Sequence, residues 1–215
     1  MALQHGNSDG NSKPLTGYKM KTIIVVTGLA RCGSSLMMQM IHAGGYPISC
    51  HPGNEAISGE HNSQTETLKQ IASGSANGKA VKSLDPLNFP LPPGNDYTFI
   101  WMERNYSQQA DSMGKFLSAL GIPVNRKGMR SLEASLPKDT DKSIKYLKRL
   151  GEVYRFSFED CLLKTSVVIE RICDIIPGLN ASIMPSVIIN RGVECYSGLL
   201  ERELIEKEKQ RRDKD

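Results

Sequence analysis

One stretch decides the fold of this 215-residue chain: TIIVVTGLARCGSSLMMQMIHAGG, at residues 22–45. An apolar β-branched run (22–27) leads into a loop that begins and ends on glycine (28–33), and an amphipathic segment (34–43) follows. The run is typical of a buried parallel strand, and the segment is typical of a helix that stops at the two glycines after it. A strand, a glycine loop and a helix in this order form an anion cradle, because backbone N–H groups and the positive end of the helix dipole face the ligand.

The loop differs from that of the nucleoside triphosphatases, G-x-x-x-x-G-K-[ST], in which the lysine reaches the phosphates and the hydroxyl binds Mg²⁺. Ser34 stands in the lysine position, and Arg31 lies inside the loop. The run 97–102 ends in Glu103 followed at once by Arg104, which is a poor magnesium site because the arginine competes for the carboxylate. We therefore expect a phosphate or sulfate group held by the planar guanidinium of Arg31, without a metal ion.

The bulk composition fits one α/β domain and excludes several classes of protein. The net charge of +4 is mild and the charges interleave, so no nucleic-acid partner is expected. The number of cysteines is odd and no Cys-x-x-Cys pair occurs, which favours reduced thiols over a disulfide framework or a zinc ribbon. No signal peptide opens the chain and the longest apolar run is too short to span a membrane, so we expect a soluble, cytoplasmic protein.

Strand and helix signals alternate along the chain, which predicts an α/β fold of the P-loop type: a central parallel sheet between two layers of helices. Strands are expected at residues 22–27, 79–84, 97–102 and 153–158. Helices are expected at residues 34–43, 64–73, 106–120, 141–150, 159–176 and 180–189, with a loop at 121–139. The domain organisation is expected to be a flexible tail (1–20), one P-loop domain (21–198) and a charged C-terminal helix (199–215).

A second anion signal follows the third expected strand. Arg104 sits at the carboxyl end of this strand, which is the edge of an open α/β sheet where ligands bind. Ser112 lies eight residues further on, in the following helix, and both side chains reach one phosphate if the helix folds back over the sheet edge. On spacing alone, a surface ion pair and an ordinary helical serine remain open.

Together the two motifs resemble those of the sulfotransferase family, whose members use 3′-phosphoadenosine 5′-phosphosulfate (PAPS) as donor. GLARCGSSLMMQMIHAGGYP is similar to the bacterial version of the first motif, including the methionine-rich helix and the Gly-Gly end. The resemblance implies that the 5′-phosphosulfate is held by Arg31, Cys32, Gly33, Ser34 and Ser35. The second motif, an arginine at a strand end and a serine eight residues later, is matched by Arg104 and Ser112 and implies that both bind the 3′-phosphate.

Three further segments resemble the family, so that the likeness extends over residues 22–198. KAVKSLDPLNFPLP is similar to the family's strand and proline-rich turn, which places Lys82 near the sulfuryl group. RFSFEDCL is similar to a later strand followed by Glu-Asp. NRGVECYSG is similar to a late Arg-Gly segment, which implies that Arg191 and Gly192 close over the 3′-phosphate.

The general base departs from the family pattern. Many members place a catalytic histidine two residues after the lysine, whereas this chain has Leu84 there and Asp85 next. Some members use a glutamate in the loop after the first helix, and Glu55 and Glu60 lie in such a loop beside His51. Asp85 and Glu55 are therefore the leading candidates, although a solvated loop charge is an alternative for each.

The sequence thus leaves several functions open. A PAPS-dependent sulfotransferase would use Arg31, Lys82 and the loop N–H groups on the transferred group, and a small-molecule, glycan or peptide hydroxyl as acceptor. A kinase with a variant loop would need magnesium and a lysine from elsewhere, and a degenerate protein would bind nucleotide without turnover. A phosphatase would use Cys32, at the start of a helix, as its nucleophile. The acceptor and the oligomeric state are left undetermined.

Overall fold

Four parallel strands form the centre of the structure, a computed structural model that describes residues 21–49 and 61–188. The strands are β1 (Ile23–Thr27), β2 (Ala80–Lys82), β3 (Tyr97–Glu103) and β4 (Gly151–Ser157), in the spatial order β2-β1-β3-β4. Every neighbouring pair is parallel, and Val26 of β1 lies opposite both Lys82 and Ile100. All five residues of β1 are buried, which confirms the buried central strand predicted from its apolar run.

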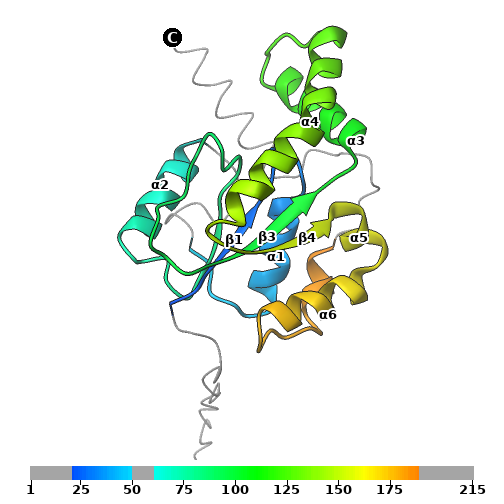
Figure 1. The fold of residues 1–215 in the computed structure, drawn as a ribbon. Coiled ribbons are helices and arrows are strands. Elements are labelled where there is room, and N and C mark those ends of the chain that lie inside the picture. Colours follow the sequence, from blue (N-terminus) through cyan, green and yellow to red (C-terminus); the bar gives the residue numbers. More distant parts are fainter. Residues whose placement is uncertain (1–20, 50–60, 189–215) are drawn as a thin grey trace, which may run out of the picture.

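Helices cover both faces of this sheet (Figure 1). On one face lie α1 (Ser34–Ala43), α5 (Phe158–Leu163), α6 (Thr165–Ile175) and the short 3-10 helix η1 (Met184–Val187). On the other face lie α2 (His61–Ala72) and α4 (Arg126–Leu147). Helix α3 (Tyr106–Ala119) continues from the end of β3, and α4 runs back beside it. The three layers confirm the predicted P-loop type of α/β fold.

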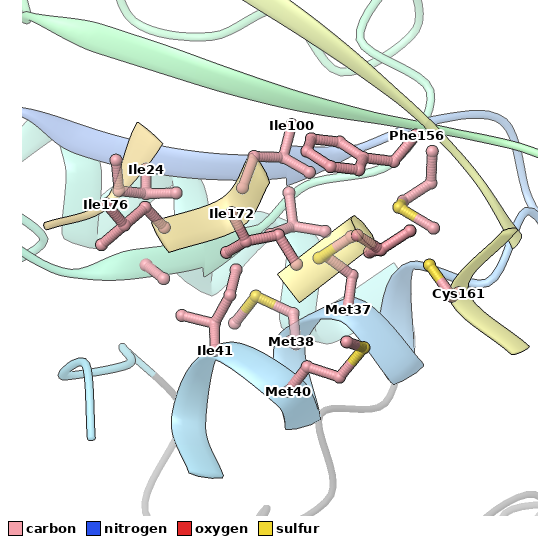
Figure 2. Packing of buried hydrophobic residues seen from close by; sticks show 14 of the residues in the cluster. Ile24, Met37, Met38, Met40, Ile41, Ile100, Phe156, Cys161, Ile172 and Ile176 are labelled. Carbon is pink, nitrogen blue, oxygen red and sulfur yellow. The ribbon is translucent and has the colours of Figure 1, made fainter. Parts of the chain in front are cut away.

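The core follows from the alternation of side chains along the strands. Ile24 and Ile100 face α1, whose buried apolar side chains are Met37, Met38, Met40 and Ile41 (Figure 2). The opposite sides of the same strands face α2 and α4 and form a second core. Truncating one such buried Ile or Met to Ala costs about 2–5 kcal/mol, so the strand–loop–helix unit is held from both sides of the sheet.

The predicted loop at 121–139 is wrong, because most of it is helical. Helix α4 extends over 22 residues and contains Pro137, which cannot donate the helical hydrogen bond to the carbonyl of Glu133. Pro137 is exposed, whereas Leu136 and Thr140 on either side of it are buried. The apolar stripe therefore continues through the proline, and its burial outweighs the lost hydrogen bond.

Three other boundaries differ from the expectation. The helix predicted at 159–176 is divided into α5 and α6, because Lys164 has a non-helical backbone (φ −130°, ψ 42°). The piece predicted at 180–189 is reduced to the four residues of η1. The predicted tail (1–20) and C-terminal helix (199–215) lie outside the described residues.

Candidate functional site

The phosphate loop leaves the sheet at Gly28, where only glycine fits. A Cβ at this position would lie 2.7 Å from the carbonyl oxygen of Met102 and 2.6 Å from the sulfur of Cys32. Gly33 ends the loop with φ +96°, and a Cβ there would lie 2.4 Å from the ring of Phe158. The loop therefore approaches its neighbours at both ends more closely than a side chain permits.

Helix α1 begins at this loop without a cap of its own. Its N-cap is Gly33, which offers no side-chain acceptor, and its first turn contains no acidic residue. The first N–H groups of a helix have no intrahelical partner, and the dipole makes that end positive. The start of α1 is therefore suited to an anionic ligand.

Arg31 connects the loop with α3. Its backbone is left-handed (φ +70°), its Nε donates a hydrogen bond to Oγ of Ser112 at 3.0 Å, and its guanidinium lies 5.2 Å from the ring centroid of Phe116. The structure thus brings the arginine of the first motif and the serine of the second motif into contact, although 81 residues separate them.

Lys82 reaches the same helix start from the end of β2. Its Nζ donates a hydrogen bond to Oγ of Ser35 at 2.9 Å. Ser35 is exposed and Ser34 beside it is buried. Lys82, Ser35 and the loop are therefore neighbours, as the resemblance implies for the groups around a transferred sulfuryl group.

Arg104 lies at the end of β3 and is only 7 % exposed. Its guanidinium stacks over the ring of Phe158 at 4.7 Å from the centroid, which is a cation–π contact. Glu103 beside it forms its ion pair with Arg155 of β4, and this carboxylate raises the pKa of the Arg155 guanidinium. In the structure the arginine that would compete with a magnesium ion for the Glu103 carboxylate is therefore Arg155, whereas the sequence had suggested Arg104.

Asp85 is anchored beside the loop. Its backbone N–H donates to the carbonyl of Gly28 at 3.0 Å, and its backbone has φ +51°. Its Oδ2 accepts a hydrogen bond from the side chain of Asn88 at 2.7 Å. Leu84, in the position of the family's histidine, is buried at 9 % exposure. Asp85 is thus a carboxylate of restricted geometry, next to the loop that carries Arg31.

Cys32 is unsuited to act as a nucleophile. Its side chain is 1 % exposed, and burial raises the pKa of its thiol against the opposing effects of hydrogen bonds from Ser34 and the charge of Lys82. A nucleophilic cysteine requires a lowered pKa and access to substrate. The geometry therefore argues against a phosphatase mechanism in which Cys32 is the nucleophile.

Several predicted site residues lie outside the described residues. These are Glu55, Glu60, His51, Arg191 and Gly192. Their roles stay predictions. Within residues 21–49 and 61–188, no three His, Cys, Asp or Glu side chains gather as ligands for a metal ion. In the same part of the chain, no helix has the length and apolarity needed to cross a membrane.

Sequence reasoning missed three residues that hold the site together. Gln109, buried at 3 %, donates from Nε2 to the carbonyl of Ala30 at 2.8 Å and to that of Leu29 at 3.4 Å. Phe116 and Phe158 lie beneath the guanidinium groups of the two arginines. Gln109 and Phe116 lie three residues before and four residues after Ser112, a spacing that places all three on one helix face.

Comparison with known proteins places this geometry in a known fold. No family model and no curated protein matches the sequence. The structure is similar to the sulfotransferase domain of the Synechococcus PCC 7002 olefin synthase, with a TM-score of 0.51 and 12% identity over 89% of this chain and 96% of that chain. It is also similar to the sulfotransferase domain from the curacin biosynthetic pathway, with a TM-score of 0.50 and 13% identity over 86% and 83% of the two chains. The chain therefore has the fold of sulfotransferase domains.

Proposed function

We propose that this protein is a sulfotransferase that moves a sulfuryl group from PAPS to an acceptor hydroxyl. The observation that carries the proposal is the hydrogen bond between Nε of Arg31 and Oγ of Ser112, at 3.0 Å. It joins the two sequence motifs that resemble the donor site of the family. A chance match of either motif would not require the two to meet at the carboxyl edge of one sheet.

The described residues fit a donor with anionic groups at both ends. Lys82 is the last residue of β2, Arg104 directly follows β3, and Arg31 lies in the loop after β1, and these three strands are adjacent in the sheet. The uncapped start of α1 adds a fourth positive element. Following the resemblance, the loop would hold the 5′-phosphosulfate, while Arg104 and Ser112 would hold the 3′-phosphate. Arg191 and Gly192 are proposed to complete this second subsite.

The donor supplies an activated sulfuryl group, and the chain supplies charge and orientation. The guanidinium of Arg31 and the ammonium of Lys82 would stabilise negative charge that develops on the oxygens around the transferred sulfur. Lys82 is placed for this by its contact with Ser35 at the start of α1. These fixed cations make a magnesium ion unnecessary in the proposed reaction.

A carboxylate would take the proton of the acceptor hydroxyl, because a leucine stands where the family's histidine would be. Asp85 is proposed first, since its backbone is bonded to Gly28 of the loop and one carboxylate oxygen is oriented by Asn88. Glu55 is the second candidate. A small-molecule, glycan or peptide hydroxyl would be the acceptor.

A kinase is the less favoured function for a specific reason. Ser35 stands at the position whose hydroxyl binds Mg²⁺ in the nucleoside triphosphatase loop, and the ammonium of Lys82 lies 2.9 Å from its oxygen. A bound magnesium ion would have to displace this cation. The other alternative is a protein that binds the nucleotide but has no functional general base. A turnover assay distinguishes this protein from the proposed enzyme.

The first test is calorimetric titration with adenosine 3′,5′-bisphosphate in the presence of a chelator. Wild type should bind with a micromolar Kd, which corresponds to about −8 kcal/mol. Arg31→Ala and Arg104→Ala should each weaken binding by about 30-fold, because each removes charge-assisted hydrogen bonds to an anion. The matched control is Arg149→Ala, which removes an exposed arginine between α4 and the amino end of β4.

Two results would overturn the proposal. One is the absence of heat with the bisphosphate together with binding of ATP that depends on magnesium, which would favour a kinase. The other is an equal loss of affinity in Arg149→Ala, which would reveal binding through net charge alone. Bisphosphate binding without sulfuryl transfer from PAPS, to phenols, sugars and peptides alike, would leave a nucleotide-binding protein without catalysis.

A further inference from the structure

Three residues on one face of α3, at successive turns of the helix, contact the phosphate loop. Gln109 donates to the loop carbonyls, Ser112 accepts from Arg31, and Phe116 lies beneath the guanidinium of Arg31. These residues are spaced by three and four, so they form a single stripe along the helix. The last two contacts involve the side chain of Arg31, whereas the first involves the backbone that precedes it.

The contact of Gln109 is made with peptide groups whose orientation determines the position of Arg31. Its Nε2 lies 2.8 Å from the carbonyl oxygen of Ala30 and 3.4 Å from that of Leu29. The Leu29 carbonyl also accepts the backbone N–H of Cys32 at 3.2 Å. The amide of Gln109 therefore spans the tight turn in which Arg31 is the left-handed residue.

A left-handed backbone at Arg31 needs such support. A non-glycine residue at φ +70° is strained by about 1–2 kcal/mol, and the strain persists only where the surroundings hold it. Gln109 is 3 % exposed, so its two bonds are shielded from competing water. A carboxylate at this position would repel both carbonyls, and an alkyl side chain would leave them without these donors.

We propose that Gln109 is a positioning residue of the donor site: by holding the Leu29 and Ala30 carbonyls it fixes the left-handed turn that directs the Arg31 guanidinium toward the bound anion. The inference rests on the proposed function, because it takes the anion at this loop to be a phosphate or phosphosulfate of the donor. It assigns to α3 a second role besides that of Ser112, through a residue that does not itself touch the ligand.

The chain offers a matched control in the preceding residue. Gln108 is a neighbouring glutamine of α3 that is half-buried, and its Oε1 is shielded from solvent without a hydrogen-bond partner among the described residues. Its backbone N–H is bonded to the side chain of Asn105 and is unaffected by a change of side chain. Gln108→Leu therefore makes the same amide-to-alkyl change on the same helix and removes no hydrogen bond to the loop.

The first measurement is binding of adenosine 3′,5′-bisphosphate to Gln109→Leu, Gln108→Leu, Arg31→Ala and the double variant Gln109→Leu/Arg31→Ala. We expect about a tenfold loss in Gln109→Leu, no change in Gln108→Leu, and a double variant no weaker than Arg31→Ala. Non-additivity is the signature of action through Arg31, which a general loss of stability would not produce. Wild-type affinity in Gln109→Leu, or losses that multiply in the double variant, would overturn the inference.

The second measurement needs no ligand, so it separates the positioning role from the proposed function. Amide hydrogen exchange at Cys32 reports on its bond to Leu29, and exchange at Met40 and Ile41 reports on α1. Gln109→Leu should accelerate exchange at Cys32 at least tenfold and leave α1 unchanged, whereas Gln108→Leu should change neither. If wild type does not bind the bisphosphate, the proposed function fails, and unaltered exchange at Cys32 would separately refute the positioning role.

Discussion

Two strand-to-helix junctions of this protein contact each other and are built in opposite ways. At the β1–α1 junction, α1 starts on Gly33 with no side-chain cap and no acid in its first turn. At the β4–α5 junction, Ser157 accepts the backbone N–H of Asp160, and Glu159 and Asp160 occupy the first turn of α5. The ring of Phe158 brings the two together, since it lies against Gly33.

The difference indicates which junction is available to a ligand. At the start of α5 the Ser157 hydroxyl accepts the N–H of Asp160, and the carboxylates of Glu159 and Asp160 complement the positive end of the helix dipole. Glu159 also accepts a hydrogen bond from the backbone N–H of Asn105 at 3.0 Å. This junction therefore helps to position the start of α3. At the start of α1 the described residues provide no such side-chain cap, and Arg31 and Lys82 add positive charge around it, so the proposed anion would bind there. Each of the following substitutions either gives one junction a feature of the other or removes a residue that only one of the two junctions has.

The largest effect is expected from Gly33→Ala. The new Cβ would lie 2.4 Å from the ring of Phe158, in a backbone of φ +96°, so the free energy of unfolding should fall by about 3 kcal/mol. Gly45→Ala is the matched control, because Gly45 has φ +89° but no atom within 4 Å of the added Cβ, and should lose about 1 kcal/mol. Urea unfolding of both variants measures the difference, and equal losses would mean that the contact with Phe158 is unimportant.

Next in size is Ser35→Asp, which gives α1 the acidic first turn of α5. The carboxylate should pair with Lys82 and repel an anion at the loop, so that affinity for adenosine 3′,5′-bisphosphate falls about 30-fold. The stability of the protein should rise by about 0.5 kcal/mol, because the acid complements the helix dipole. Calorimetry and thermal unfolding give the two readouts.

The control for this change is Ser166→Asp, in the first turn of α6, whose start also lacks a side-chain cap. It should bring the same gain in stability without any change in affinity. Retained affinity in Ser35→Asp would place the anion elsewhere.

A smaller effect is expected from Ser157→Ala, which removes the cap of α5. Loss of the hydrogen bonds to Asp160 and Glu159 should lower the free energy of unfolding by about 1 kcal/mol. The affinity for the bisphosphate should stay within a factor of two, because Ser157 forms its hydrogen bonds with residues of α5 and not with the proposed ligand site. Denaturant titration and calorimetry on the same sample test both statements, and a tenfold loss of affinity would show that the junctions are coupled more tightly than through Phe158.

The smallest effect concerns the thiol of α5. Burial, together with the charges of Asp160 and Glu159, raises the pKa of Cys161 to about 12, from 9.0 in the unfolded chain. Between these values the unfolded state binds fewer protons than the folded state, so the stability contributed by this thiol is fully present well below pH 9, begins to fall as the pH approaches 9 and continues to fall toward pH 12. From pH 7.5 to pH 9 the loss due to this thiol should be about 0.4 kcal/mol. Cys161→Ala should lose that much less over the same interval, and parallel pH profiles would contradict the assignment.

The residues of the candidate site could be singled out from the sequence where they are close together in the chain. The glycine loop, which contains Arg31, and the two serines form one continuous segment of the chain. Ser112 lies eight residues after Arg104, in the helix that begins there. Local spacing constrains such groups because a strand followed by a tight turn and a helix has few geometries. Lys82 was assigned through resemblance alone, and its contact with Ser35 depends on the pairing of β1 with β2.

The long helix α4 shows where local reasoning fails. The sequence predicts a loop at 121–139, which contains the basic residues Arg126, Lys127 and Arg130, and the structure has a helix there although Pro137 removes one of its hydrogen bonds. In the folded chain α4 lies against α3 and the sheet, and burial of Leu136, Ile144 and Leu147 exceeds the cost of one missing bond. That gain exists only after the sheet has formed.

By itself, the sequence determined the strand–loop–helix unit, the parallel α/β architecture and the positions of Arg31 and Arg104 after two of the strands, because these follow from hydrophobic periodicity and from residues adjacent in the chain. Only the tertiary structure decided that Arg31 meets Ser112, that Gln109 holds the loop from α3, and that Phe158 stands between the two junctions. These contacts join elements up to 125 residues apart (Gly33 to Phe158). They arise from strand order and helix packing, which no local pattern encodes.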